Sequence, residues 1–183
     1  MQDNSQSESP GRVVVGVDGS PGAGEALRWA AAEARLRGAR LRVVHAWTFG
    51  YPGAGGGGYG YPYIGGSADT LPGAGLNDLR EAAEELVDQV IADVVAETDG
   101  LEIEPWVVEG SPVDVLVHAV AAGDVLVVGS RGHGGFTGLL LGSVSQQCAH
   151  HAPCPVVIVR ATKPSTTGSS PASAARTTAT SSA

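Results

Sequence analysis

A glycine-rich stretch, VVGSRGHGGFTGLLLGSVSQ (residues 127–146), holds residue types that could do chemistry. Gly129 and Gly132 follow a short valine run, and Gly142 and Ser143 stand where a helix is expected to begin. Glycine lets backbone N–H groups turn outward and lets a ligand approach closely. A helix N-terminus adds oriented dipoles that favour an anion. We interpret the stretch as a phosphate cradle, with a long loop that contacts nothing as the alternative.

The spacing distinguishes this stretch from two common phosphate-binding motifs. A P-loop needs a Lys beside its last glycine, whereas the single Lys of the chain, Lys163, lies near the C-terminal end. The dinucleotide fingerprint GxGxxG has a glycine spacing that is not found here. Arg131 could supply a cation for a phosphate, and the alternative for it is a solvated surface arginine.

Short β-branched runs alternate with amphipathic segments along the chain. This alternation predicts an α/β fold, with a parallel sheet, right-handed crossovers and helices on both faces. Ligands bind such sheets beyond the carboxyl ends of the strands, where the winding direction reverses. If the first and fourth strands are neighbours, that point lies between Asp18 and Gly129. Strands are expected over 12–18, 39–47, 101–110, 123–130 and 155–160, and helices within 19–38, over 74–100, from Ser111-Pro112 onward, and over 143–151.

Composition divides the 183 residues into one folded domain and two tails. Residues 1–11 are polar and aperiodic and residues 161–183 are rich in Ser, Thr and Ala, so both tails are expected to be disordered. Residues 12–160 are expected to form one α/β domain. Within it, the Gly- and Pro-rich residues 48–75 are interpreted as a flexible linker, with a lid over a ligand as the alternative. The lid would use Tyr51, Tyr59, Tyr61 and Tyr63.

Charge and hydropathy argue against two classes of partner. The net charge is −8, whereas a nucleic-acid binder needs a basic face. No apolar run is long enough to span a bilayer and no signal segment is found, so we expect no membrane partner and a cytoplasmic location.

Two further groups of residues have both a chemical and a structural interpretation. Cys148, His150, His151 and Cys154 form an allowed zinc set by type, but adjacent histidines diverge on a helix, and we favour an ordinary helix-to-strand connection. His45 lies inside a strand and is predicted to be a satisfied core histidine.

The spacing Gly129-x2-Gly132-x9-Gly142-Ser143 matches G-x2-G-x9-G-[ST], the ATP-binding signature of the universal stress protein family. The opening VVVGVDGS and the closing HAPCPVVIVR also resemble that family, and the resemblance covers roughly residues 11–161. It implies a Rossmann-like, adenine nucleotide alpha hydrolase-like fold whose five parallel strands have the order 3-2-1-4-5. It also implies a homodimer along the last strand.

The resemblance further implies an ATP site, and because the signature glycines are kept, the chain resembles the ATP-binding branch. Asp18 would lie near the ribose and phosphates, with Mg²⁺, and the backbone of Ala46 would contact adenine. The other implied contacts are Val17 and Gly19 beside Asp18, Val128, Gly129, Arg131 and Gly132 at the ribose and first phosphates, and Gly142, Ser143, Val144 and Ser145 at the outer phosphates.

These residues predict a nucleotide-dependent regulatory module of the stress response, with an unknown protein partner and slow or no ATP hydrolysis. Phosphoryl transfer depends on positioning and charge neutralisation, and the sequence offers neither a phosphate-binding lysine nor a nucleophile–base pair. An ATPase or adenylate-transferring enzyme is one alternative, and a protein–protein adaptor with a vestigial site is another. The segment from Pro155 to Arg160, an edge strand of Val and Ile, independently favours a homodimer.

Overall fold

A computed structural model describes residues 11–48, 76–94, 100–132 and 140–161. Outside the described residues lie nearly all of the two expected tails, most of the Gly- and Pro-rich segment with its four tyrosines, and His133. In the described part of the chain, no helix combines the length and the apolar character needed to cross a membrane.

Within the described residues, five parallel strands form one sheet in the order β3-β2-β1-β4-β5. This confirms the predicted fold class and strand order. β1 and β4 are central neighbours, so the winding direction reverses between them, and a ligand is expected beyond their carboxyl ends. The strands are β1 (Val13–Gly16), β2 (Leu41–Trp47), β3 (Ile103–Glu109), β4 (Val125–Gly129) and β5 (Val156–Val159).

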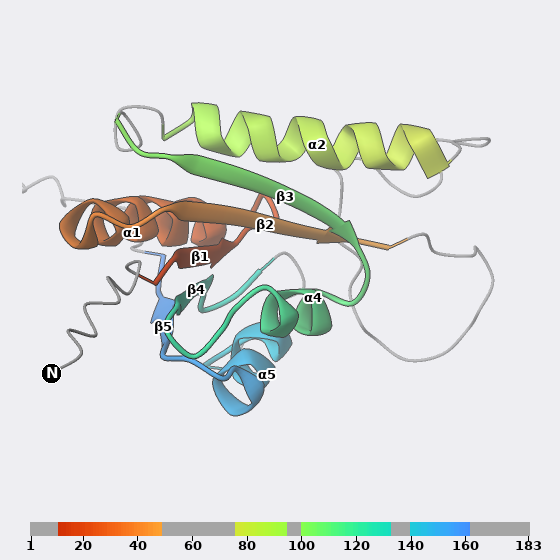
Figure 1. Ribbon diagram of the computed structural model, residues 1–183. Helices are drawn as coiled ribbons and strands as arrows, with labels where there is room; N and C mark the ends of the chain where they lie inside the picture. The colour runs from red at the N-terminus through yellow and green to blue at the C-terminus, as the bar shows by residue number, and fades with distance from the viewer. Residues whose placement is uncertain (1–10, 49–75, 95–99, 133–139, 162–183) are drawn as a thin grey trace, which may run out of the picture.

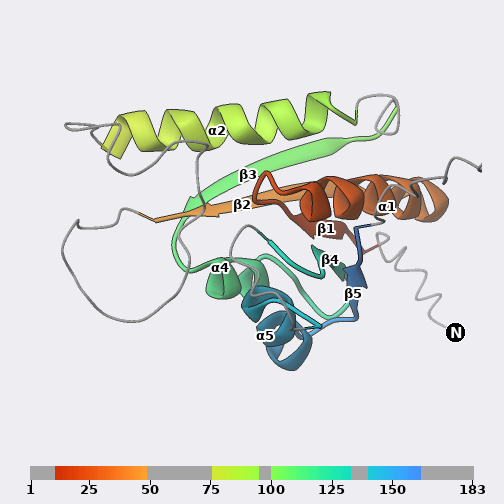
Figure 2. The same ribbon diagram turned by 180° about the vertical axis from the view of Figure 1, so that it is seen from behind.

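The described helices cover both faces of the sheet (Figure 1). Helices α1 and α2 share one apolar cluster with one face of the strands, and helices α4 and α5 share a second cluster with the other face. Figure 2 shows the same layers from behind, with α1 beside β1 and with α4 and α5 together below the sheet. The helices are α1 (Pro21–Arg37), α2 (Leu76–Ala92), α4 (Pro112–His118) and α5 (Ser143–His151).

Successive side chains of a strand point to opposite sides of the sheet, and in β1, β2 and β4 most of them are buried on both sides. Val15 and Val43 are buried in the cluster of α1 and α2, whereas Val14 and Leu126 are buried in that of α4 and α5. This explains why the strands are almost continuous apolar runs in the sequence.

Helix α1 lies within the predicted residues 19–38, and both of its ends are capped. The Ser20 hydroxyl accepts a hydrogen bond from the N–H of Ala23 at 3.2 Å, and Pro21 occupies the first helical position. Gly38 ends the helix in the left-handed conformation, at φ 60°. In α4, by contrast, Ser111 occupies the N-cap position but its side chain makes no capping hydrogen bond.

The predicted extent of the second helix, residues 74–100, was wrong at its C-terminal end. Helix α2 ends at Ala92, and Asp93 and Val94 form a turn. The last turn carries no basic residue, and an acidic residue at a helix C-terminus opposes the helix dipole, so this end is poorly stabilised. Residues 95–99, which the prediction also covered, lie outside the described part.

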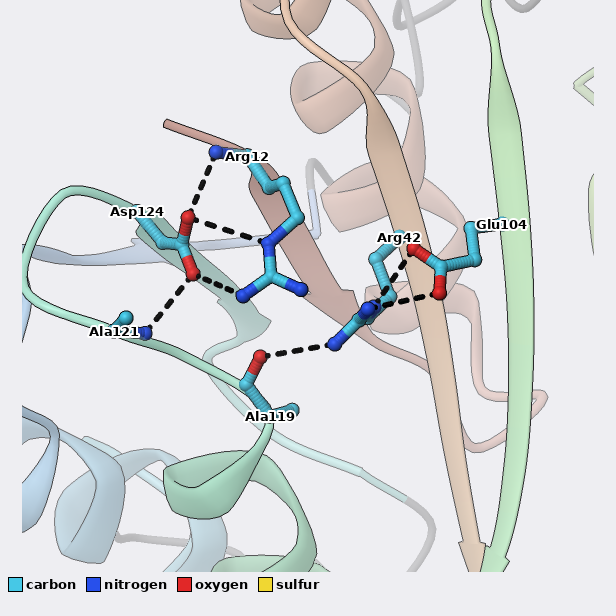
Figure 3. A network of polar contacts seen from close by, with 6 residues as sticks. All are labelled: Arg12, Arg42, Glu104, Ala119, Ala121 and Asp124. Carbon is cyan, nitrogen blue, oxygen red and sulfur yellow. Dashed lines mark hydrogen bonds and ion pairs between the residues drawn. The ribbon is translucent and has the colours of Figure 1, made fainter. Parts of the chain in front are cut away.

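A polar network holds the amino edge of the sheet, opposite the carboxyl ends of the strands (Figure 3). Asp124, just before β4, is 5% exposed. Its carboxylate accepts hydrogen bonds from the backbone N–H and the guanidinium of Arg12, each at 2.8 Å, and from the N–H of Ala121 at 2.9 Å. The start of β1 and the connection between α4 and β4 are therefore joined by one carboxylate.

Arg42 extends this network across β2 and β3. Its guanidinium donates two hydrogen bonds to Glu104, at 2.8 and 3.0 Å, and a longer one to the carbonyl of Ala119. It also lies 5.0 Å from the centroid of the Trp106 ring, within cation–π range. Polar side chains thus connect four segments at this edge (Figure 3).

Candidate functional site

The predicted site residues meet at one edge of the molecule. Because all strands are parallel, the residues that follow them lie at the carboxyl edge of the sheet, where the N-terminus of α5 also lies. They are Val17, Asp18 and Gly19 after β1, Ala46 near the end of β2, Val128, Gly129, Arg131 and Gly132 in and after β4, and Gly142, Ser143, Val144 and Ser145 at the start of α5.

The Asp18 carboxylate lies directly against the backbone of Gly132. A methyl group added to Gly132 would collide with Oδ2 of Asp18. The other oxygen, Oδ1, accepts a hydrogen bond from the N–H of Ser20 at 3.0 Å, which holds the carboxylate in a local turn. Gly19 stands in that turn at φ 78°, a conformation that favours glycine. The structure therefore brings Asp18 and Gly132 together, as the predicted site requires.

Gly129 has a packing role that the sequence did not reveal. A Cβ atom at Gly129 would come within 3.0 Å of the carbonyl group of Gly22, in the first turn of α1. A Cβ atom at Gly22 would in turn come within 2.8 Å of the carbonyl oxygen of Arg131. The first turn of α1 rests directly on the end of β4, so helix packing by itself requires a glycine at position 129.

The carbonyl of Ser130 fastens the start of α5 to the end of β4. It accepts hydrogen bonds from the N–H of Gly142 at 2.8 Å and from the hydroxyl of Ser145 at 3.2 Å. The same hydroxyl lies 2.9 Å from the carbonyl of Gly142, so the two carbonyls share its one proton. The Ser145 side chain, 2% exposed, is therefore used inside the protein, and only its backbone N–H can serve a ligand.

The first turn of α5 presents N–H groups without intrahelical partners. The first helical hydrogen bond runs from the N–H of Gln146 to the carbonyl of Gly142. The N–H groups of Ser143, Val144 and Ser145 precede it, and no acceptor for them is found among the described residues. Together with the helix dipole, these groups can bind an anion.

Arg131 adds a cation to this edge. Its side chain is exposed, and in the described ranges no carboxylate forms an ion pair with it. Gly142 lies next to the backbone of Arg131. A Cβ atom on Gly142 would be 3.5 Å from the Cα of Arg131. The backbone of Arg131 therefore lies beside the open start of α5, and a guanidinium carried on that backbone would suit a phosphate there.

The described residues contain no group of three or more His, Cys, Asp or Glu side chains that could hold a metal ion. Cys148, His150, His151 and Cys154 lie within the described residues and do not form such a group. Cys148 is fully buried, and this burial, with a smaller contribution from Cys154, raises the pKa of its thiol to about 11. The burial of Cys148 fits a packing role in the apolar cluster of α4 and α5.

His45 was predicted to be a satisfied core histidine, and the structure confirms this only in part. It is buried, as predicted, and its Nδ1 lies 2.8 Å from the carbonyl oxygen of Val17. Its Nε2, however, is buried without a hydrogen-bond partner, so only half of the ring is satisfied. The sequence holds no signal for this contact, because it depends on where β1 and β2 separate.

A matched pair of serine variants tests the roles assigned to α5. Ser145→Ala is expected to lower the free energy of unfolding by about 1 kcal/mol, because it removes the hydrogen bond shared between a buried and a partly buried carbonyl. Ser143→Ala removes an exposed hydroxyl that caps nothing, and should change that free energy by less than about 0.5 kcal/mol. Urea unfolding measures both. Equal losses of stability would show that the Ser145 hydroxyl does not stabilise the junction of β4 and α5.

Comparison with known proteins identifies the family. The model of the universal stress protein family matches residues 10–160. The chain belongs to the universal stress protein family. A universal stress protein of Mycolicibacterium smegmatis is 32% identical to it over 161 residues, which cover 84% of this chain and 49% of the relative. The chain spans about half the length of the first curated relatives that it matches.

Two solved universal stress proteins share the fold. One, in complex with cAMP, has a TM-score of 0.57 and 25% identity, over 85% of this chain and 100% of that one. The other, from Archaeoglobus fulgidus in complex with dAMP, has a TM-score of 0.52 and 26% identity, over 81% and 97% of the two chains. The family predicted from the glycine spacing is thereby confirmed.

Proposed function

We propose that this universal stress protein binds an adenine nucleotide, ATP with Mg²⁺, at the carboxyl edge of its sheet. The observation that carries the proposal is the open first turn of α5 beside the exposed Arg131. Backbone N–H groups, a helix dipole and a guanidinium together favour a phosphate group. The two solved relatives with cAMP and dAMP support an adenine nucleotide over another anion.

The residues at this edge fit the parts of Mg²⁺-ATP. Asp18 and Gly132, which lie against each other, would flank the ribose and the inner phosphates. Mg²⁺ is bound by one or two carboxylates together with phosphate oxygens and water, so the single carboxylate of Asp18 suits it. The start of α5 would take the outer phosphates, and the peptide of Ala46 would take the base.

We further propose that the protein is a regulatory module of the stress response, acting in the cytoplasm, whose nucleotide occupancy is read by a protein partner. ATP hydrolysis is expected to be slow or absent. Phosphoryl transfer requires several charges around the phosphates, and the site residues assigned here include one arginine, Arg131, and one carboxylate, Asp18. The only lysine, Lys163, lies beyond the last strand.

The test is to denature the purified protein, identify any released nucleotide, and titrate the nucleotide-free protein with Mg²⁺-ATP, ADP and AMP by calorimetry. The control is the double variant Gly142→Val, Ser143→Val. Gly142 has φ −76° and ordinary space for a Cβ atom, and the larger valine side chains should obstruct the phosphates. ATP binding by the wild type alone supports the proposal. Failure to bind any of the three nucleotides would favour an adaptor with a vestigial site.

Hydrolysis is measured in the same preparation. A rate well above background that is abolished by Asp18→Ala, with ATP binding retained, would replace the regulatory proposal with an ATPase.

We also propose that two copies pair along β5. Among the described strands, β5 pairs only with β4. The carbonyls of Pro155 and Val159 accept hydrogen bonds from β4, so Val156 and Ile158 direct their backbone groups to the free side. Exposed edges of this kind tend to pair. Light scattering at micromolar concentration should give twice the monomer mass, and a monomer mass there would contradict the pairing.

A further inference from the structure

His45 connects the ends of two strands at the carboxyl edge. Its Nδ1 lies 2.8 Å from the carbonyl oxygen of Val17, the residue before Asp18. A carbonyl can only accept, so Nδ1 carries the proton. Burial lowers the pKa of His45, and the hydrogen bond to Val17 and the charge of Asp18 oppose this only in part. The ring is therefore neutral and its Nε2 is a bare acceptor.

Stability alone does not favour a histidine at this position. The His45 side chain is 1% exposed, and its Nε2 has no hydrogen-bond partner. A buried acceptor without a partner costs free energy, and an apolar side chain of similar size would avoid that cost. The contact made by Nδ1 is thus the feature that distinguishes His45 from a leucine.

That contact stands where the β1–β2 ladder stops. Alternate residues of β2 bond to opposite neighbours: the carbonyl of Val44 accepts from Val17 on the β1 side, and that of Trp47 accepts from Gly110 on the β3 side. Ala46, like Val44, therefore points its N–H and carbonyl toward β1. In a continuing ladder the N–H of Ala46 would donate to the Val17 carbonyl. The register ends one residue earlier, however, and His45 occupies that carbonyl instead.

The Ala46 peptide is left open at this point. Among the described residues, neither its N–H nor its carbonyl forms a hydrogen bond across to the end of β1. An N–H donor beside a carbonyl acceptor matches the edge of adenine, which offers a ring nitrogen acceptor beside an amino donor. Guanine presents the reverse order on the same edge and would leave both groups unpaired.

We propose that His45 is a positioning residue that sets base preference: by taking the Val17 carbonyl, its imidazole keeps the Ala46 peptide open for adenine. The inference rests on the nucleotide site proposed above. Without the imidazole donor, the Val17 carbonyl would be a buried acceptor whose nearest substitute is the N–H of Ala46. The β1–β2 ladder would then gain one hydrogen bond, from the N–H of Ala46 to the Val17 carbonyl. That N–H would no longer be available to the base.

The experiment compares His45→Leu, His45→Asn and His45→Gln with the wild type by calorimetric titration with Mg²⁺-ATP and Mg²⁺-GTP. Asparagine places its amide N–H near the position of Nδ1, whereas glutamine carries the same amide one methylene farther out. The ratio of ATP to GTP affinity should fall by about tenfold in the Leu and Gln variants and stay within about threefold of the wild type in the Asn variant. GTP affinity itself should change little, because the phosphate contacts are untouched.

Three outcomes are decisive. Leu and Gln variants that keep the wild-type ratio would overturn the role of His45 while leaving the nucleotide site intact. A wild type that binds neither nucleotide would overturn the proposed function and this inference with it. Long-range ¹H–¹⁵N correlation spectra of the wild type should show the Nδ1-protonated tautomer, and a proton on Nε2 would overturn the inference without any variant.

Discussion

Replacing Gly132 with alanine is expected to lower the affinity for Mg²⁺-ATP by at least about tenfold, which corresponds to about 1.4 kcal/mol. The added methyl group would collide with Oδ2 of Asp18, whose other oxygen is held by the N–H of Ser20. Either the carboxylate leaves that hydrogen bond or the loop after β4 moves away. Both changes separate two residues that the proposed site needs side by side.

The matched control for this variant is Gly123→Ala. A Cβ atom at Gly123 would meet nothing within 4 Å, and the residue lies just before β4, at the opposite edge of the sheet. Both positions are exposed, so both variants should unfold within a few degrees of the wild type. Calorimetric titration should then show weak binding only for Gly132→Ala. Wild-type affinity in that variant would mean that the contact between Asp18 and Gly132 has no part in binding.

This comparison separates the two interpretations of the glycine-rich stretch. A loop that contacts nothing would tolerate alanine at position 132 as well as at position 123. A phosphate cradle would not, because the backbone at position 132 is pressed between Asp18 and the ligand. The close contact between Gly132 and the Asp18 carboxylate favours the cradle.

The elements of the fold were predictable because each one carries a local signal. The β-branched runs, the Ser111-Pro112 start of α4 and the glycine that ends α1 each indicate a conformation within a few residues. The end of α2 was missed because its apolar pattern continues through Val94, while the charge of Asp93 opposes the helix dipole. Hydrophobic periodicity therefore predicted the existence of each element better than its last residue.

The roles of individual site residues were less predictable, because they depend on contacts between distant segments. Gly129 looked like a ligand glycine, but the first turn of α1 requires it as well. Ser145 looked like a phosphate ligand, but its hydroxyl closes the junction of β4 and α5. His45 looked like a satisfied core residue, but only one of its nitrogens has a partner. The motif predicted which edge of the sheet to consider, and only packing shows which side chains are already used inside the protein.

At the opposite edge, Asp124→Asn is expected to lower the free energy of unfolding by about 2 to 3 kcal/mol at pH 7. The buried carboxylate accepts hydrogen bonds from Arg12 and Ala121, and an amide of the same shape would turn a donor toward one of them. Arg12 is partly exposed, so its charge can be hydrated after the change, which keeps the loss below that of a fully buried pair. Nucleotide affinity should not change, because the network lies away from the carboxyl edge.

Urea unfolding measures this loss, and Glu84→Ala is the control for a surface ion pair. Glu84 and Arg80 are 2.8 Å apart but both are exposed, so breaking their pair should cost less than about 0.5 kcal/mol. A loss at Asp124 no larger than the loss at Glu84 would mean that the network of Figure 3 adds no stability beyond an ordinary surface pair.

The pH dependence of the same variant gives a second, independent check. Burial raises the pKa of Asp124, but the hydrogen bonds from Arg12 and Ala121 outweigh it, and the folded-state pKa is lowered. A carboxyl with a lowered folded pKa contributes stability fully above its unfolded pKa of about 3.9, and this contribution is lost as pH falls through the folded value. The difference between wild type and Asp124→Asn should therefore be constant from pH 7 to about 5 and shrink below about pH 4, where the protonated acid resembles the amide. A difference that persists undiminished into acid would show that the negative charge of Asp124 is not the source of its contribution to stability.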